Sequence, residues 1–458
     1  LVTGTSVTDA RVLKVKFTVT GKSTNPANSI YDISLRNITM DDALKDSNVK
    51  WRLYKNNTLL SSGDFSPTFD VMENNRMVLT TTQQDLTTTA STYVFLMWIS
   101  ESCAGDIANC TNSDNQFKYV GKSFSFNIKL ETATKTKKNL TRKTSASGTI
   151  TTLYNNATKT PVTNNSITYQ YDTKNSLMKD VGGNIRYYGA SPNNYIYFNC
   201  SDYSNQSSST CEAWRIIGVF DGRIKLIRGS QIGSYSWDNK NTSTGAESNY
   251  GKNDWTDARL MKLLNPSYES ETTGGSLYYN AKSGNCYAGQ NNATTTCNFT
   301  STGIKNDTTR NLISNTTYYL GGWNSTSVYP NQIYEYERGT TVYTERPTIW
   351  QGKIALPYPS DYGYATDLGK CSQTLYNYDD SICASNNWMK SILAPNYGWL
   401  LTTSSSDSYS TWPVGSRGFV GSGITYNTYG IVPVLSLSSE LSIKAGTGSS
   451  SAPYQLSV

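Results

Sequence analysis

Eight cysteines constrain this chain more than any other feature of its sequence. They form four local pairs, and the gaps between pairs are much longer than the gaps within them: Cys103 with Cys110, Cys200 with Cys211, Cys286 with Cys297, and Cys371 with Cys383. Among the many possible connectivities, this spacing favours four disulfides that each close a short loop. No C-x-x-C spacing occurs, so cysteine-bound zinc is not expected. Disulfides predict an oxidising, extracellular location.

The chain of 458 residues contains no histidine. This excludes Ser-His-Asp and Cys-His catalysis, and zinc sites built on histidine, within the chain. No apolar run approaches the ~20 residues that a transmembrane helix needs. Because the chain begins with Leu1 and shows no signal-peptide pattern, we expect a secreted protein of the cell surface whose signal segment has been removed.

Residues 1–132 alternate between apolar and polar side chains, as half-buried strands do. In "VLKVKFTVT" one face carries Leu13, Val15, Phe17 and Val19, and "KSFSFNIKL" repeats the pattern near residue 130. Several short segments of this kind lie between them, one with a turn at Asn56 and Asn57. Short strands at this spacing predict an antiparallel β-sandwich.

Residues 133–166 are rich in Thr, Lys and Asn, and we expect a linker there, with at most a strand at "GTITTLY". The densest basic cluster of the chain lies in this segment: Lys135, Lys137, Lys138, Arg142 and Lys143. No aromatic stacking platform accompanies it, so a solvated linker is favoured over a nucleic-acid site.

Residues 167–458 predict an α+β domain, which makes the whole chain mostly β. Two helices are expected, at 254–265 with Asp254 as the cap and at 386–394. Strand-like segments surround them, among them "RGFVGSG", "GIVPVLSL" and the apolar hairpin of Cys211–Gly229. Asp221 and Gly222 favour a tight turn in that hairpin, with Trp214, Ile216 and either Val219 or Phe220 in the core.

Candidate catalytic and metal-binding groups are few. Glu335 and Glu337 in "YEYE" are expected on one strand face, and Asp361 follows in "PSDYGY". Paired carboxylates could hydrolyse glycosides, but exposed strand carboxylates are usually only solvated. We therefore predict no enzymatic activity, no catalytic residues and no metal ligands. Oxygen-rich loops leave calcium binding as an alternative.

Ten ordered blocks of the C-terminal part carry a resemblance to a known group of proteins. They are "NIRYYGASPNNYIYFNC", "CEAWRIIGVFDGRIKLIRG", "SYSWDN", "NDWTDARLMKLLN", "YYLGGWN", "KIALPYPSDYGYAT", "NNWMK", "GWLLT", "GIVPVLSLSSELSIKAGTG" and "APYQLSV". Residues 184–458 thereby resemble a domain of secreted and surface proteins of Gram-positive gut bacteria. That domain is in turn similar to the C-type-lectin-like fold, which formylglycine-generating enzymes share.

The resemblance implies a central sheet containing "WRIIGVF" and "GIVPVLSL", flanked by the two helices. It also implies a variable loop region at about 268–350, where lectin-like modules bind ligands. The calcium-site motifs of lectins are missing, and every cysteine is already assigned to a disulfide, so the cysteine pair of the enzymes is not carried over. Aromatic residues in and near the loops could stack on sugars, although core packing is the favoured interpretation: Tyr318, Tyr319, Trp323, Tyr362 and Tyr364.

The N-terminal part resembles, more loosely, the β-sandwich subunits of secreted matrix fibres, because a strand follows soon after the start of the chain. The segment Leu13, Val15, Phe17 and Val19 could pair with a neighbouring subunit by strand addition, or it could be an ordinary first strand. We expect an extracellular structural protein that polymerises with itself into a filament, a pilus-like structure or a matrix fibre. The alternative is a monomeric adhesin that binds glycans through the lectin-like domain.

Overall fold

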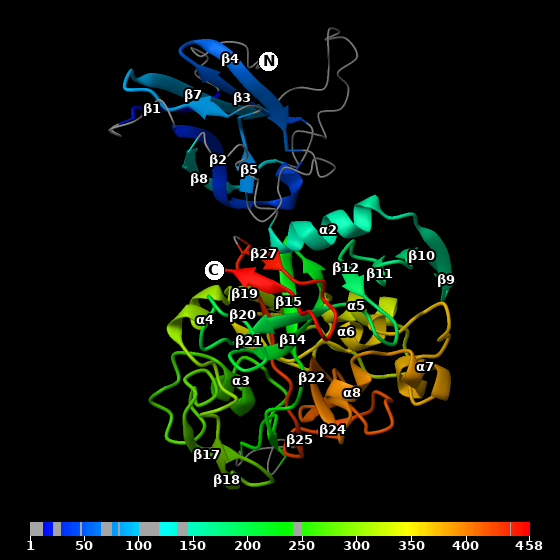
Figure 1. The fold of residues 1–458 in the computed structure, drawn as a ribbon. Helices are drawn as coiled ribbons and strands as arrows, with labels where there is room; N and C mark the ends of the chain where they lie inside the picture. Colours follow the sequence, from blue (N-terminus) through cyan, green and yellow to red (C-terminus); the bar gives the residue numbers. More distant parts are fainter. Residues whose placement is uncertain are drawn as a thin grey trace. The chain divides into compact units, whose positions relative to one another are not determined.

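The computed structural model describes residues 12–21, 29–45, 48–65, 76–80, 83–99, 119–134, 145–240, 250–439 and 441–458. The chain divides into two compact units, Leu1–Thr144 and Ser145–Val458 (Figure 1). Both are rich in antiparallel strands, which confirms the predicted mostly β class with an α+β C-terminal part. No helix in the described ranges is long and apolar enough to cross a membrane.

The N-terminal unit is a sandwich of two antiparallel sheets. The first has the order β1-β7-β3-β4, with bounds Leu13–Val19, Ser91–Ile99, Val49–Lys55 and Thr58–Asp64. In the second, β2 (Ser29–Met40) pairs with β8 (Phe124–Thr134) on one side, and with β5 (Arg76–Val78) and β6 (Gln84–Asp85) on the other. The 3-10 turn Asp42–Leu44 follows β2. Positive φ angles at Asn56 and Asn57 form the predicted β3–β4 turn.

Two contacts show how the sheets of this sandwich face each other. The Phe95 ring on β7 lies 5.5 Å from the Phe126 ring on β8. At the other end, the Ser61 hydroxyl on β4 donates to the carbonyl of Leu79, just after β5. Therefore β1 and β8, the outermost strands of their sheets, lie at the same end of the sandwich.

The C-terminal unit is built on a nine-stranded sheet of order β21-β26-β15-β14-β12-β11-β10-β9, with β13 also paired to β14. The strand bounds, in that order and with β13 last, are Ile354–Ala355, Val434–Ser436, Arg223–Arg228, Glu212–Phe220, Ile185–Tyr187, Leu177–Lys179, Ile167–Asp172, Thr160–Asn164 and Tyr195–Phe198. The two segments expected in a central sheet are β14 and β26. Trp214, Ile216 and Val219 are buried, and positive φ angles at Asp221 and Gly222 form the β14–β15 turn.

A five-stranded sheet, β16-β25-β22-β23-β24, lies beyond the central sheet. Its strands span Ser234–Ser236, Thr428–Gly430, Gly398–Thr403, Ser410–Val414 and Gly423–Ile424. The segment "RGFVGSG", expected as a strand, contributes a single bridge between Val420 and Val414, and only its last residue, Gly423, belongs to a strand, β24. The chain ends in the hairpin of β27 (Ser442–Ala445) and β28 (Gln455–Ser457).

The predicted linker is wrong from residue 145 onward. Ala146–Asn156 forms helix α2, and Ser145 caps it by accepting a hydrogen bond from the backbone of Gly148. The helix buries Ile150 and Tyr154 in the main core of the C-terminal unit, and β9 follows within the expected linker. The expected strand at "GTITTLY" is therefore helical. Residues 135–144, with the basic cluster, lie outside the described residues.

The two predicted helices exist but are shorter than expected. Helix α3 spans Arg259–Leu264, and Asp254 caps the preceding turn instead, through the backbone and side chain of Thr256. Helix α8 spans only Lys390–Leu393. Three further helices, α5 (Pro330–Glu337), α6 (Pro359–Tyr364) and α7 (Ser381–Ser385), and a 3-10 turn at Leu375–Asn377 complete this part of the fold.

The predicted loop region at 268–350 contains several helices and strands between its turns. It contains the hairpin of β17 (Ser283–Tyr287) and β18 (Thr294–Asn298), helix α4 (Asp307–Leu312), strand β19 (Thr316–Tyr319) and helix α5. Strand β19 pairs with β20 (Ile349–Gly352). The region is thus part of the packed unit, and Tyr278 and Phe299 are completely buried in its core.

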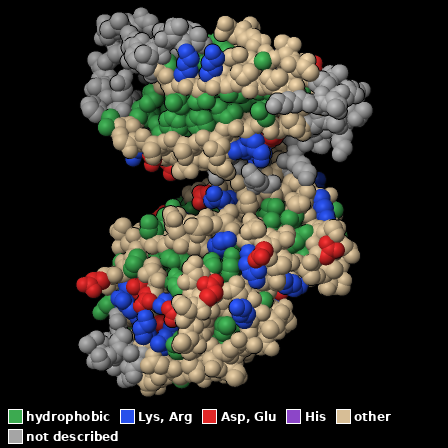
Figure 2. Space-filling model, turned by 90° about the vertical axis from the view of Figure 1, so that its left-hand side faces the viewer, with side chains coloured by type: hydrophobic (Ala, Val, Ile, Leu, Met, Phe, Trp, Pro, Cys, Tyr) green, Lys and Arg blue, Asp and Glu red, His purple; other side chains and the backbone are tan. Residues whose placement is uncertain are grey.

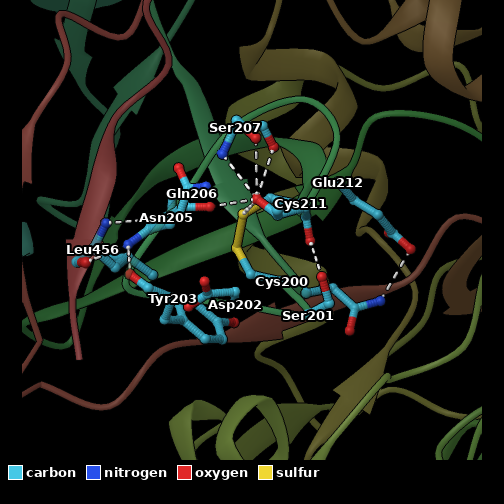
Figure 3. Close-up of a disulfide and its surroundings, with 12 residues drawn as sticks. Cys200, Ser201, Asp202, Tyr203, Asn205, Gln206, Ser207, Cys211, Glu212 and Leu456 are labelled. Atoms are coloured by element: carbon cyan, nitrogen blue, oxygen red, sulfur yellow. Dashed lines mark hydrogen bonds between the residues drawn. A yellow bond between two sulfur atoms is a disulfide. The ribbon is translucent and has the colours of Figure 1, made fainter.

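Three disulfides are present in the described residues, and they join Cys200 to Cys211, Cys286 to Cys297, and Cys371 to Cys383, as the spacing predicts. Cys103 and Cys110 lie outside the described residues. The first loop holds the C-terminal strand, because the Gln206 amide donates to the Leu456 carbonyl (2.6 Å) and accepts from the Leu456 backbone amide (2.9 Å) (Figure 3). The loop closed by the Cys200–Cys211 disulfide therefore holds a contact between residues 250 positions apart.

Replacing Cys200 and Cys211 together with serine is expected to lower the free energy of unfolding by about 2–3 kcal/mol, because the short loop regains its freedom in the unfolded chain. Hydrogen exchange should also rise in β28. The matched control replaces Cys286 and Cys297, which close a loop of the same sequence separation, 11. That control should leave β28 protected. Equal exchange of β28 in both variants would contradict this role of the Gln206 loop.

Candidate functional site

The open end of the N-terminal sandwich is the candidate functional site. Strand β1 pairs with β7 along one edge, and no other described strand pairs with it. Strand β8 likewise pairs only with β2 among the described strands. An edge strand leaves every second backbone N–H and C=O group without a sheet partner. Two such edges lie together at this end, one above the other.

The side chains that point inward from these two strands are only partly covered. On β1, Leu13 is 42% exposed and Val15 and Phe17 are half-buried, while Val19 is buried. On β8, Leu130 is 41% exposed, and the remaining inward positions are half-buried: Phe124, Phe126 and Ile128. By contrast, Ile33, Leu35 and Phe95 in the middle of the same core are fully buried.

Figure 2 shows the consequence as a continuous hydrophobic band across the N-terminal unit, bordered by polar atoms. Aromatic stacking holds part of the band in place: Phe17 stacks on Tyr93 at 5.4 Å, and Phe124 on Phe126 at 6.0 Å. Lys14 and Lys16 alternate with the apolar residues of β1 and point away from the core. Among the described residues, no strand covers the apolar side chains of β1 and β8 at the open end, so part of the sandwich core is exposed there.

The structure places the predicted assembly residues, Leu13, Val15, Phe17 and Val19, together on β1 at this open end. The sequence of β8 shows the same alternation, but only the residues of β1 were predicted to take part in assembly. The sequence signal that could have pointed to β8 is that the first and last strands of the domain, β1 and β8, share this alternating pattern. That both strands are edges at one end follows only from the sheet order.

Most of the candidate ligand-loop aromatic residues are buried, in agreement with core packing, the favoured interpretation. Tyr362 and Tyr364 lie on α6 and are completely buried, and the Tyr362 hydroxyl donates to the Gly418 carbonyl. Tyr318 is buried beside Trp350. Trp323 is half-buried and stacks on Tyr336 at 3.8 Å. Their rings fill the core because alternate residues of short helices and strands face inward.

Tyr319 is the exception among these residues. It is 39% exposed, and its cross-strand partner on β20, Ile349, is 53% exposed. The Arg338 guanidinium lies 5.4 Å from the centre of the Tyr319 ring. These residues form a small apolar and aromatic surface on the β19–β20 strand pair.

Two of the three candidate carboxylates, Glu337 and Asp361, are buried. The segment "YEYE" is helical, so the strand assignment was wrong. Glu337 ends α5 and is fully buried, whereas Glu335 is exposed. The Ser360 backbone amide donates to Glu337 Oε1 (2.8 Å), and the Ser360 hydroxyl donates to Oε2 (2.5 Å). Burial raises the pKa of Glu337 to about 7, although Arg338 and Ser360 act in the opposite direction.

Asp361 belongs to a buried charge cluster that joins α6 to the central sheet. The Arg186 guanidinium donates to Asp361 Oδ1 (2.8 Å) and to Asp180 Oδ2 (2.5 Å), and Lys225 Nζ donates to Asp361 Oδ2 (2.5 Å). All four side chains are almost completely buried. Burial alone would raise the pKa of Asp361, but Lys225 and Arg186 lower it below its usual value. No group of His, Cys, Asp and Glu in the described ranges could hold a metal ion.

The raised pKa of Glu337 predicts a pH dependence of stability. The folded state holds this proton more tightly than the unfolded state, whose pKa is near 4.5. The stabilisation is present below pH 4.5 and is lost as the pH rises towards about 7, on the order of 3 kcal/mol in total. Glu337→Gln should therefore flatten the stability profile between pH 5 and 8, measured by urea unfolding. The exposed neighbour supplies the control, Glu335→Gln, and an unchanged profile in Glu337→Gln would contradict the prediction.

No protein-family model, curated protein or solved structure matches this chain.

Proposed function

We propose that the protein is an extracellular structural protein of the bacterial surface, a subunit of a filament, a pilus-like structure or a matrix fibre. The single observation that carries this proposal is the open end of the N-terminal sandwich, where the apolar faces of two edge strands are left half covered. The disulfides and the β-rich fold fit an extracellular protein.

Strand addition from a second copy of the chain would complete this core. An added strand beside β1 would pair with the backbone groups along its outer edge and place alternate apolar side chains over Phe17 and Phe126. Each Leu, Ile or Phe side chain that becomes fully buried contributes about 1.5–3 kcal/mol. The outward-facing Lys14 and Lys16 disfavour pairing of two β1 strands, since like charges would lie opposite each other. They favour a partner strand with neutral or acidic outward residues.

The test is the oligomeric state of the purified full chain. Sedimentation velocity across a wide concentration range should show association, and electron microscopy of native material should show fibres. Cysteine pairs placed on β1 and on a second, differently tagged copy should give crosslinks between chains. A protein that stays monomeric at every concentration, with no crosslink between chains, would rule out the proposal.

The second candidate is a monomeric glycan-binding adhesin, and the exposed Tyr319 ring beside Arg338 favours it. An aromatic face next to a guanidinium can stack on a sugar ring while offering hydrogen-bond donors. A glycan array with and without calcium should then show binding that Tyr319→Ala abolishes. An array without hits under both conditions would eliminate this candidate.

A further inference from the structure

The buried contact between Lys225 and Asp361 has the geometry of two reactants. Lys225 lies on β15, in the middle of the central sheet, and Asp361 lies on α6. The distance from Lys225 Nζ to Asp361 Oδ2 is 2.5 Å, and both side chains are almost completely buried. The rings of Tyr358 and Phe220 lie 4.5 and 5.0 Å from Nζ. Because the fold already holds the two groups in contact, the entropy cost of bringing them together does not add to the reaction barrier.

We propose that Lys225 and Asp361 join in an intramolecular isopeptide bond, a covalent staple between the central sheet and α6. This inference goes beyond the proposed assembly, because it concerns the C-terminal unit and does not depend on polymerisation.

The surroundings supply what amide formation needs. Burial lowers the pKa of the Lys225 amine, which favours the neutral, nucleophilic form. Arg186 Nη1 donates to Asp361 Oδ1 and the Tyr358 backbone amide donates to Oδ2 (3.0 Å), so both oxygens of the electrophile are polarised. Arg186 Nη2 is buried and has no hydrogen-bond partner among the described residues. Arg186 can therefore stabilise the negative oxygen that develops on the adduct.

The reaction balances without any oxidant or other reactant. The reaction starts from the neutral form of the pair, in which a proton has passed from the Lys225 ammonium to the Asp361 carboxylate. The lowered pKa of Asp361 makes this the minor form. The Nζ lone pair then forms a bond to Cγ, with the oxyanion on Oδ1 held by Arg186. The bond from Cγ to Oδ2 breaks, and Oδ2 leaves as water with the transferred proton and a second proton from Nζ. The product is a secondary amide, and Arg186 stays paired with Asp180.

Mass spectrometry of the full chain tests the bond directly. After reduction of the disulfides, the intact protein should be lighter than its sequence mass by one water molecule. Trypsin should release residues 224–228 joined to residues 354–370, because the amide blocks cleavage after Lys225. The peptide map also excludes loss of water elsewhere, for example at Asp221–Gly222. An intact mass equal to the sequence mass, with residues 354–370 recovered alone and with cleavage after Lys225, would overturn the proposal.

Two variants separate the covalent bond from the ion pair. Lys225→Arg keeps the positive charge but cannot form the amide, so its mass should equal the sequence mass. Asp361→Asn can form the same amide with loss of ammonia, so its product should have the wild-type mass. If neither variant folds, as judged by circular dichroism, the wild-type peptide map still decides the question. A Lys225→Arg protein that still loses one water molecule would also overturn the assignment.

Discussion

A variant with lysine at both Leu13 and Leu130 is expected to self-associate only at concentrations at least about tenfold higher than the unchanged protein. Both side chains are more than 40% exposed, so lysine is tolerated in the isolated subunit. In the assembled state, each new ammonium group would be buried without a partner against the added strand. That penalty exceeds the ~1.4 kcal/mol that corresponds to a tenfold change in affinity. Sedimentation velocity over a concentration series measures the shift.

Leu59→Lys is the matched control for this experiment. Leu59 is 48% exposed and lies on β4, at the opposite edge of the same sheet. It makes the same leucine-to-lysine change at one position outside the open end. We expect its association to equal that of the unchanged protein, and thermal unfolding should show that all variants fold. If Leu59→Lys impairs association as strongly as the double variant, assembly does not use the open end.

Local patterns in the sequence were sufficient to identify several strands and turns of the fold. The two-residue alternation of Leu13–Val19 and Phe124–Thr134 follows directly from half burial, and the turns at Asn56–Asn57 and Asp221–Gly222 need residues that accept positive φ angles. The disulfide pairs follow from their spacing. The strand edges of the candidate site were only partly predictable, because sheet order depends on which segments meet in three dimensions.

Helix α2 shows where local propensity fails. Its sequence, "ASGTITTLYNN", contains three Thr, one Ile and one Tyr, which favour strands. Tertiary packing of Ile150 and Tyr154 in the core overrides that preference, and Ser145 caps the helix. A serine before this stretch was the one local signal that could have indicated a helix start.

The aromatic residues failed as ligand candidates for a different reason. Tyr362, Tyr364 and Tyr318 have the composition of a sugar-binding surface, but composition does not say which way a ring points. The charge cluster was missed because Asp180, Arg186, Lys225 and Asp361 come from segments far apart in the chain. Fully buried charges are rare in proteins, so the sequence offers no prior reason to expect them.

Arg186→Met is expected to destabilise the C-terminal unit by about 3–5 kcal/mol, the largest effect on stability predicted for a single substitution in this chain. Methionine has a similar length and packs between Phe220 and Tyr364, whose rings lie 4.6 and 4.8 Å from the guanidinium carbon. Lost packing is therefore small. The cost arises because Asp180 loses its only ion-pair partner among the described residues and stays buried with a negative charge.

Urea unfolding followed by tryptophan fluorescence measures this effect, since Trp214, Trp237 and Trp399 are completely buried in the C-terminal unit. Arg417→Met is the control, because Arg417 pairs with Asp379 at the surface with its side chain 76% exposed. Exposed pairs contribute about 0–1 kcal/mol, so the control should unfold almost like the unchanged protein. Similar midpoints for both variants would show that the cluster is not stabilising. A large loss of unfolding free energy in Arg186→Met alone would show that Arg186 holds α6 to the central sheet by neutralising the buried carboxylates.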